Sequence, residues 1–558
     1  YDEEAQYGIQ FQYKNGQVRS VKEITEATSY TSTTQTGALI EMNHLVKGQT
    51  KYRDYGNDRR YDTSDDLLTY YTFDYAGRTV NAYTTDNAGR LLGASNAVYS
   101  GVGDTDRRNN RTLKTATVGV SAMNELRNHG FEKSSPEWTL TGVNGTDTNI
   151  VTRAMTGSEL VRTGQNACKG WIRPGKSNTI SVSRSTEPLT AGKAYTFSAY
   201  VNTSQCTSFN GKGVYLQVTG NGINQKSDYL NYQSSKEVDG GWVRLSVTFT
   251  PPVKGTYTVG IYNHGAGPYF YADDVQVERA GAPSNLNLVE NGNLQYWGVD
   301  WTMGPLADYK KGVGLFSTDE YACSIEIRGD AYKESCAYQD IPIYQTGKTY
   351  VLSGWAKADA IPDNEEKAEG EDAAARDKYK QFGLRAELTY SDNSKEYHYV
   401  PFNSDVKEWQ YASLAIVPKK TGTQVKSIRV ICAYERNGNV AYFDNLSLTQ
   451  EVAQTMKYDK EGKLVSVKST GKEEETSKYE NGNLKELVTG GNGTYTYDYD
   501  ENHNLKSVTN DYVKDTLTHD GMGNTLTSTM ESAKTSAGKI VSSSAYTNGG
   551  NLLSKVTQ

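Results

Sequence analysis

Proline and methionine are scarce in this 558-residue chain, which has only 12 and 7 of them. Tyrosine and glycine are abundant instead, with 42 and 53 residues, and the many Thr, Ser, Val and Tyr strings favour strands and turns over helices. No apolar run approaches the roughly 18 residues of a membrane-spanning helix, so we expect no membrane span. The chain has 59 basic and 66 acidic residues. The basic residues form no dense Lys/Arg cluster, which argues against a nucleic-acid partner.

Cysteine is also rare, and the short motifs of metal sites and enzymes are missing. The five cysteines have no Cys-x-x-Cys spacing and no histidine at metal-ligand spacing, so we expect small buried core residues and predict no disulfide. The six histidines show no His-Glu-x-x-His pattern, and no serine lies in Gly-x-Ser-x-Gly. We therefore predict that the chain is not an enzyme. Paired acids for glycoside hydrolysis, meeting from distant strands, are the alternative.

Tryptophan separates the chain into a middle and two flanks, because all seven tryptophans lie between positions 138 and 409. The flanks repeat a short unit instead: an aromatic residue, often an Asp, a turn with Gly or Asn, and an aliphatic residue. The units begin at Tyr13, Phe73, Thr85, Tyr458, Tyr479, Tyr499 and His519. The last four lie 21, 20 and 20 positions apart. One hairpin cannot bury its own apolar face, so this fixed period predicts stacked neighbouring hairpins.

This repeat resembles the Rhs/YD-repeat family, whose hairpins coil into a hollow β shell. The resemblance covers residues 1–118 and 452–558, and it implies a secreted or cell-wall-associated bacterial protein. The family's end-of-shell motif, an Asp-Pro and a Gly near a cleavage point, is absent, so we expect no toxin domain or autoprotease here. The chain starts at Tyr1 and stops at Gln558 within a repeat, which predicts a piece of a longer YD-repeat protein. An unrelated repetitive β solenoid is the alternative.

The middle of the chain is a tandem duplication. Five anchors recur in the same order with offsets between 155 and 171: Asn128 and Asn291, Trp138 and Trp301, Tyr195 and Tyr350, Trp242 and Trp409, and Asp273 and Asp444. Alternating apolar residues within each copy predict two antiparallel sheets, with the four recurring tryptophans in the core. A charged insertion at 359–380 should be a solvated loop, with a short helix as an option.

We therefore predict an all-β chain of four parts. Residues 1–118 and 452–558 should form YD-repeat β-hairpin arrays, and residues 119–281 and 282–451 should form two tandem antiparallel β-sandwiches.

The order of the anchors resembles carbohydrate-binding modules of the galactose-binding-like jelly-roll class. Those modules open with Asn-x-Gly-Phe-Glu, have Gly-Lys-x-Tyr before a central strand, and close with Tyr-x-Asp-Asp-Val. The first copy matches them at 128–132, 192–195 and 271–275. The resemblance implies a polysaccharide or a cell-surface glycan as the partner.

The same resemblance implies a structural Ca²⁺ at the edge of each sandwich. Its ligands would be the oxygens of Glu132 and Asp273 in the first copy and of Asp444 in the second, where Gln295 replaces the Glu. The alternative is that Asp273 and Asp444 only satisfy backbone N–H groups.

Sugar binding needs a flat aromatic ring under the C–H face of a pyranose and polar groups for its hydroxyls. In 214–218 the aliphatic residues should point inward, so that Tyr215 and Gln217 face the open side of the sheet. The same alternation turns Arg385 and Glu387 outward in the second copy, a charged face that suits an acidic sugar, an internal ion pair or no ligand. Trp171 should also face outward, and Glu326 stands at its place in the second copy.

Three functions fit this sequence. The first is non-catalytic glycan binding and adhesion, with the sandwich pair displayed by the YD scaffold. In the second, both sandwiches are structural spacers whose sugar faces are empty. The third, compatible with the first, is a shell segment of a wall-associated toxin-delivery protein.

Overall fold

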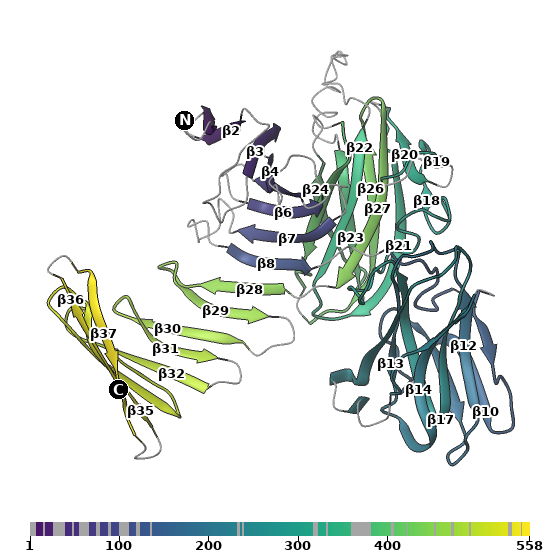
Figure 1. Cartoon of the computed structure of the whole chain (residues 1–558). Coiled ribbons are helices and arrows are strands. Elements are labelled where there is room, and N and C mark those ends of the chain that lie inside the picture. Colours follow the sequence, from purple (N-terminus) through teal and green to yellow (C-terminus); the bar gives the residue numbers. More distant parts are fainter. Residues whose placement is uncertain are drawn as a thin grey trace. The chain divides into compact units, whose positions relative to one another are not determined.

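The computed structural model describes residues 7–14, 17–25, 40–46, 49–54, 66–73, 79–86, 91–99, 111–118, 123–133, 137–230, 235–236, 239–315, 322–330, 333–358, 381–402, 407–420, 422–450, 453–469, 474–489, 493–533, 538–547 and 550–558 (Figure 1). The named elements of these residues are β-strands and the 3-10 turn η1 (Asp239–Gly241), and Ser235 and Lys236 are helical. The predicted all-β class is confirmed. No helix among these residues is long and apolar enough to cross a membrane.

The chain divides into two compact units. Unit 1 comprises Tyr1–Asn96 and Ala116–Glu451, and unit 2 comprises Ala97–Thr115 and Val452–Gln558. Unit 1 holds both copies of the duplication. We call them module 1, with its strands between residues 139 and 278, and module 2, with its strands between 302 and 450. The finer domain boundaries that the sequence suggests stay predictions.

Module 1 is an antiparallel sandwich of two sheets. Its strands are β9 (Thr139–Thr141), β10 (Thr148–Ala154), β11 (Asn166–Ile172), β12 (Thr179–Ser185), β13 (Tyr195–Asn202), β14 (Cys206–Gly220), β15 (Ile223–Lys226), β16 (Trp242–Phe249) and β17 (Thr258–Glu278). Sheet 1a has the order β9-β12-β17-β14-β15, and sheet 1b has the order β10-β11-β17-β13-β16. The long strand β17 joins them, because residues 258–268 pair in 1a and residues 269–278 pair in 1b.

Module 2 repeats this topology with two separate sheets. Its strands are β18 (Thr302–Met303), β19 (Ala307–Lys311), β20 (Cys323–Arg328), β21 (Cys336–Gln345), β22 (Tyr350–Ala358), β23 (Gln381–Tyr390), β24 (Lys395–Pro401), β25 (Gln410–Ile416), β26 (Val425–Glu435) and β27 (Val440–Gln450). Sheet 2a has the order β18-β21-β26-β23-β24, and sheet 2b has the order β19-β20-β27-β22-β25. Strands β26 and β27 take the places of the two halves of β17. The predicted pair of tandem sandwiches is confirmed.

The alternation of side chains places the core between the two sheets of each module. Val214, Leu216 and Val218 on β14 point inward and have no exposed surface. Burial of each such side chain contributes about 1.5–3 kcal/mol to folding. Leu384 and Leu388 on β23 are buried in the same way, so the predicted parity of both strands is confirmed.

Two of the four recurring tryptophans lie in the core and two do not. Trp138 and Trp301 are buried, and each indole Nε1 donates to the carbonyl of the recurring Asn, at 3.0 and 3.3 Å. The prediction was wrong for Trp242 and Trp409, which are half-buried. In β16 the residues that point inward are Leu245, Val247 and Phe249, so Trp242 has the opposite parity and faces outward. Trp409 directly precedes β25 and packs against Tyr83, Trp355 and Tyr411 instead of entering the core between the sheets.

The five cysteines behave as small core residues. All are free thiols; Cys168, Cys206, Cys323 and Cys432 are buried, and Cys336 is half-buried. Burial raises the pKa of the Cys323 thiol to about 11, so this thiol is not a reactive thiolate.

The N-terminal hairpins are formed by β1 (Tyr7–Lys14), β2 (Gln17–Thr25), β3 (Ile40–Val46), β4 (Gln49–Asp54), β5 (Leu67–Phe73), β6 (Thr79–Asp86) and β7 (Leu91–Tyr99). Strands β1 and β2 form a separate hairpin, and β3 to β7 pair with their chain neighbours. The predicted turns at 15–16, 74–78 and 87–90, and the charged insertion at 359–380, lie outside the described residues.

The C-terminal array contains β8 (Arg111–Val118), β28 (Ala453–Tyr458), β29 (Leu464–Ser469), β30 (Glu475–Glu480), β31 (Asn483–Thr489), β32 (Gly493–Tyr499), β33 (Leu505–Thr509), β34 (Val513–His519), β35 (Thr525–Ser532), β36 (Ile540–Tyr546) and β37 (Leu552–Thr557). These strands pair in this order, each with the next. Strand β8 pairs directly with β28, through Thr115 opposite Ala453. Both modules are therefore an insertion between two neighbouring strands of one hairpin array.

The Asp of the repeat organises the turn that follows it. Its Oδ1 accepts the backbone amides of the residues two and four positions further on, at 2.8–2.9 Å, in Asp459, Asp500 and Asp520. The fourth residue of the turn has a positive φ, 79° at Gly462 and 85° at Gly523, which costs glycine little. This is the tight turn that the repeat predicts.

Candidate functional site

Trp171 lies on the outer face of sheet 1b. Its strand neighbours Gly170 and Ile172 are buried, so the indole points away from the core and is half-buried. Gly170 is required here, because a Cβ at this position would lie 1.9 Å from Cε1 of Phe270 on β17. In the structure the Trp171 side chain points outward, as the sequence predicts.

Three neighbouring strands bring an amide and two aromatic rings into one row. Asn149 on β10 lies opposite Trp171 on β11, and Trp171 lies opposite Tyr269 on β17. Residues directly opposite each other in antiparallel strands share one face of the sheet. The row therefore provides an indole and a phenol ring side by side, with a carboxamide at one end.

A groove of about 600 Å³ follows this row. It is lined by Asn144, Gly145, Thr148, Asn149, Val151, Arg153, Lys169, Trp171 and Tyr269. The lining thus combines aromatic surface with amide, guanidinium and ammonium donors. Such a combination of apolar platforms and a few polar groups is typical of carbohydrate sites.

The two cations of the groove are held by one carboxylate. Glu159 accepts from Arg153 Nη2 at 2.7 Å and from Lys169 Nζ at 2.7 Å. These hydrogen bonds, Arg153 first, lower the pKa of Glu159 to about 2. Lys169 Nζ also lies 4.1 Å from the centre of the Tyr269 ring. Both cations are therefore oriented, and their charge is partly neutralised.

Tyr215 and Gln217 lie on the other sheet of module 1. They belong to β14 in sheet 1a, so the structure does not bring Tyr215 and Trp171 into one site. The Tyr215 ring stacks on Tyr262, with ring centres 5.5 Å apart, and is largely buried. Gln217 Nε2 donates to Asn224 at 2.7 Å. Most of the Tyr215 ring is thus already covered by neighbouring side chains.

Arg385 and Glu387 face outward from sheet 2a and are engaged in ion pairs. Arg385 Nη1 lies 2.9 Å from Glu435, and Glu387 lies 2.5 Å from Lys395. This arrangement corresponds to the internal ion pairs that the sequence left open.

The strand registers change which residue of module 2 corresponds to Trp171. Tyr269 and Val440 each precede the recurring Asp by four positions, and Val440 lies opposite Arg328. Arg328 therefore takes the place of Trp171, whereas Glu326 takes the place of Lys169. Module 2 has no aromatic pair at this position of its face.

The residues expected to bind Ca²⁺ in module 1 hold backbone amides. Glu132 Oε1 accepts from the amides of Gln165 and Asn166 at 2.8 and 2.9 Å. Asp273 Oδ2 accepts from the amides of Arg162 and Thr163 at 2.9 and 3.2 Å. Burial, and then the neighbouring Asp274, raise the pKa of Asp273.

Two observations bear on the fit of a cation. Asp274 Oδ1 is buried without a hydrogen-bond partner among the described residues. A Cβ on Gly130 would lie 3.6 Å from Asp273 Oδ1 and 3.8 Å from Asp274 Oδ1, so both oxygens face this glycine. Hard oxygens of this kind suit Ca²⁺. However, the part of the chain that the structure describes holds no group of three His, Cys, Asp or Glu side chains arranged for a metal.

Module 2 offers fewer oxygens for a cation. Asp444 accepts from the amides of Leu315 and Asn445 at 2.8 and 2.7 Å, and burial raises its pKa to about 7. Gln295, which replaces the Glu, donates to the carbonyl of Glu125 in module 1 at 3.3 Å.

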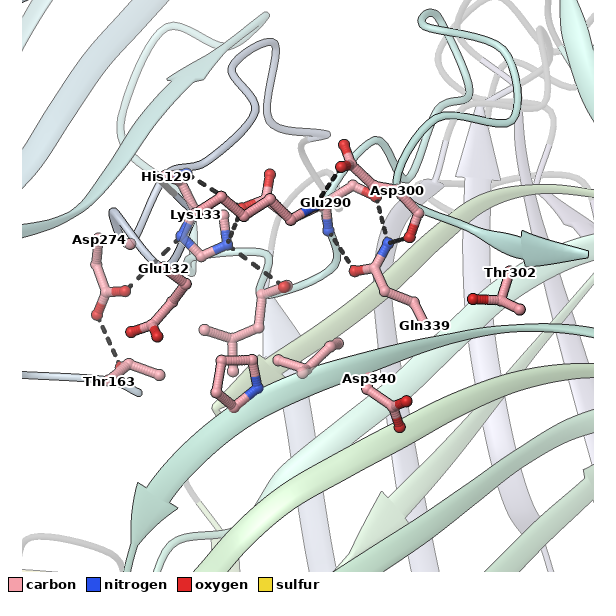
Figure 2. A pocket seen from close by; sticks show the side chains of 14 residues that line it. His129, Glu132, Lys133, Thr163, Asp274, Glu290, Asp300, Thr302, Gln339 and Asp340 are labelled. Atoms are coloured by element: carbon pink, nitrogen blue, oxygen red, sulfur yellow. Dashed lines mark hydrogen bonds and ion pairs between the residues drawn. The ribbon is translucent and has the colours of Figure 1, made fainter. Parts of the chain in front are cut away.

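A second cavity, of about 250 Å³, lies between the two modules (Figure 2). His129 of module 1 lies between Asp274 and Glu290, with nitrogen–oxygen distances of 3.8 and 3.6 Å. Glu290 also accepts from the backbone amides of Asn128 and His129, at 2.8 and 3.1 Å. Arg127 pairs with Asp300 at 2.5 Å. These contacts fix the junction of the modules, and we assign the cavity no ligand.

No family model matches the chain. It is 24% identical over 401 residues to the tRNA nuclease WapA of Bacillus subtilis (strain 168). It is 23% identical over 401 residues to the tRNA3(Ser)-specific nuclease WapA of Bacillus spizizenii. Each match covers 68% of this chain and 16% of the relative, so the chain spans about a sixth of the length of these proteins.

Solved structures with similarity include the tandem CBM22-1-CBM22-2 domains of Paenibacillus barcinonensis Xyn10C. The identity is 16%, the match covers 59% of this chain and 98% of that one, and the TM-score is 0.22. The TmCBM61 module in complex with β-1,4-galactotriose is 20% identical, over 28% of this chain and 99% of that one, with a TM-score of 0.21. A Stig cyclase from Fischerella sp. is 15% identical, over 29% and 100%, with a TM-score of 0.24. TM-scores this low leave the functional argument to the geometry of module 1.

Sequence reasoning missed most of the groove around Trp171. Asn149, Arg153, Lys169 and Tyr269 carry no motif, and their place follows from the register of β10, β11 and β17. One signal was available: Tyr269 lies in the closing strand, at the same alternation as the Tyr that begins its Tyr-x-Asp-Asp motif.

Proposed function

We propose that this chain is a non-catalytic, glycan-binding segment of a secreted or cell-wall-associated bacterial YD-repeat protein. In this proposal module 1 binds a polysaccharide or cell-surface glycan in the groove along Trp171 and Tyr269. The observation that supports it is the row of Asn149, Trp171 and Tyr269 across three strands, bordered by Arg153 and Lys169. The hairpin array would display this face, as a shell segment of the longer protein.

The chemistry of the groove suits an extended sugar chain. Indole and phenol rings stack on the C–H faces of successive pyranoses, while amides and cations donate to hydroxyl or carboxylate oxygens. Trp171 and Tyr269 lie on adjacent strands, which are about 4.7–4.9 Å apart in a sheet. A chain lying across the strands would therefore contact both rings. Each stacking contact is modest, so we expect a Kd on the order of micromolar to millimolar for one module.

Titration calorimetry of the full chain with soluble plant and bacterial polysaccharides tests the proposal. Trp171→Ala and Tyr269→Ala should each weaken binding, because each removes one platform. Tyr215→Ala is the matched control, since it removes an aromatic ring from the opposite sheet of the same module. If binding survives the first two substitutions and is lost with Tyr215→Ala, the site is on sheet 1a. If no glycan binds, the modules are structural spacers.

The spacer function has support of its own in module 2. Arg328 replaces Trp171 there, and Arg385 and Glu387 are occupied by ion pairs. We therefore propose that module 2 contributes architecture and that module 1 contributes binding. If Trp171→Ala abolishes binding by module 1, the full-length variant should have no residual affinity for glycans, because module 2 contributes none.

We also propose that Glu132 and Asp273, with Asp274, hold a structural Ca²⁺ in module 1. The cation would supply positive charge where burial raises the pKa of both carboxyl groups. Asp274 Oδ1 supports this assignment, because it is buried without a hydrogen bond among the described residues and forms an ion pair with His129 at 3.8 Å. The corresponding site that we propose in module 2 offers a single carboxylate, that of Asp444. We therefore expect module 1 to bind Ca²⁺ more tightly than module 2.

A further inference from the structure

The outer face of sheet 2b is covered by hairpins of the N-terminal array. Tyr83 on β6 and Leu91 on β7 are buried together with Trp355 on β22 and Tyr411 on β25, in one apolar cluster. All four belong to unit 1. The N-terminal hairpins β5 to β7 therefore contact module 2 through a defined set of side chains.

Tyr83 is the centre of this contact. Its ring lies 5.0 Å from the ring of Tyr411 and 6.1 Å from the ring of Trp355, with edge-to-face angles of 60° and 77°. Tyr70 of β5, which lies opposite Tyr83 in the strand pairing, stacks on it, with ring centres 4.6 Å apart and planes at 9°. Aromatic pairs in these geometries contribute about 0.5–1.5 kcal/mol each beyond the burial of their area. Burial raises the pKa of Tyr83 well above its usual range.

Polar side chains fix the register of the contact. Ser413 Oγ of module 2 donates to Asn96 Oδ1 at 3.0 Å, and Asn81 Nδ2 donates to both Ser413 Oγ and Asn96 Oδ1. Asn81 lies opposite Asn96 in the pairing of β6 and β7. All three side chains are buried. Buried polar groups are costly unless paired, so these three hydrogen bonds favour one position of the hairpin on the sheet. The Nδ2 of Asn96 is buried without a hydrogen-bond partner among the described residues.

Module 1 provides an internal comparison for this face. By strand register, Tyr200 corresponds to Trp355, Arg244 to Tyr411 and Ser246 to Ser413. Ser413 is 3% exposed, whereas Ser246 is exposed. The Tyr200 ring carries guanidinium groups instead of a hairpin: Arg162 lies 3.5 Å and Arg244 5.4 Å from its centre. The same serine is thus covered in one copy and open in the other.

We propose that the outer face of sheet 2b is a docking site for a tyrosine-bearing β-hairpin, with β6 and β7 of the same chain as its occupant. Trp355 and Tyr411 of the face contact the Tyr83 ring of the hairpin. Ser413 of the face hydrogen-bonds to the side-chain amides of Asn81 and Asn96. Module 2 is then the adaptor that attaches the sandwich pair to the repeat array. This inference does not depend on glycan binding by module 1.

Hydroxyl-radical footprinting of the full chain, quantified peptide by peptide, tests the docking. In the wild type, Trp355 and Tyr411 should be oxidised more slowly than the half-buried Trp171. Tyr83→Ala removes the central ring and should raise the oxidation of Trp355 and Tyr411 several-fold. Thr84→Ala, on the opposite face of β6, is the matched control and should leave both rates unchanged.

A second pair of variants leaves the hairpin sequence intact. Ser413→Arg introduces a long charged side chain under β6 and β7 and should expose Trp355 and Tyr83. Ser246→Arg makes the same change at the open position of module 1 and should not affect them. The proposal is overturned if Trp355 is oxidised as fast as Trp171 in the wild type. It is also overturned if either Tyr83→Ala or Ser413→Arg leaves the Trp355 rate unchanged, or if a control raises it equally.

Discussion

Gly170→Ala should destabilise module 1 from directly beneath the proposed glycan groove. The new Cβ would lie 1.9 Å from Cε1 and 2.6 Å from Cδ1 of Phe270, a ring with no exposed surface. Phe270 has to move into a filled core, and overpacking of this kind costs about 1–3 kcal/mol. For a domain of this size each kcal/mol lowers the Tm by about 2–4 °C. We therefore expect a loss of about 2–12 °C for module 1.

Thermal unfolding followed by pulsed hydrogen exchange measures this loss within the intact chain. Peptides from β11 and β17 report the unfolding of module 1 alone. Gly281→Ala is the control, because a Cβ there meets no atom within 4 Å and should shift the midpoint little. Phe270→Leu in the Gly170→Ala background should recover part of the loss by making room. Equal midpoints for wild type and Gly170→Ala would refute the packing of Phe270 under the Trp171 row.

Three further predictions concern ions, protons and the junction of the modules. Addition of EDTA should lower the melting temperature of module 1, because a ligand bound only to the folded state stabilises that state. Asp273→Ala should abolish this effect of EDTA. A melting curve that EDTA leaves unchanged argues against bound Ca²⁺. Burial raises the pKa of Asp444 to about 7, so its contribution to the stability of module 2 is fully present below the unfolded pKa of about 3.9 and is lost as the pH rises through 7. Asp444→Asn should flatten that dependence in melting experiments between pH 4 and 8; an unaltered pH profile would count against it. Glu290→Gln weakens two hydrogen bonds to amides of module 1 and should accelerate hydrogen exchange in residues 127–130, without doing so in unit 2.

The sequence predicts the architecture well because the architecture depends on periodic patterns. Alternation in 214–218 and 384–388 orients both strands correctly, and the five recurring anchors reveal two copies of one topology. The Asp and the positive-φ residue of each repeat are enough to predict its turn. These signals are local, so one sequence contains them.

The candidate site is harder to predict because it depends on which strands become neighbours. Trp171 could be placed on an outer face from its own strand, but Tyr269 follows it almost a hundred positions later. Tyr215 has the same outward parity as Trp171 and lies on the opposite sheet, which no local pattern reveals. The recurrence of Trp242 in both copies wrongly predicts burial, because its parity in β16 is opposite to that of the inward residues.

The insertion of the modules depends on a pairing that no motif announces. Thr115 and Ala453 are neighbours across β8 and β28, although more than three hundred residues separate them in the sequence. The contact of Asn81 and Asn96 with Ser413 is of the same kind, since it joins small polar residues that are common in any β protein. Such long-range pairs are specified by the fold as a whole.

A glycan array probed with the full chain and with its Trp171→Ala variant tests the central claim most directly. The account predicts that the wild type binds at least one class of plant or bacterial polysaccharide, and that Trp171→Ala loses this signal while Tyr215→Ala keeps it. Two results would contradict the account: full retention of glycan binding by the Trp171→Ala variant, or no glycan binding by the wild type.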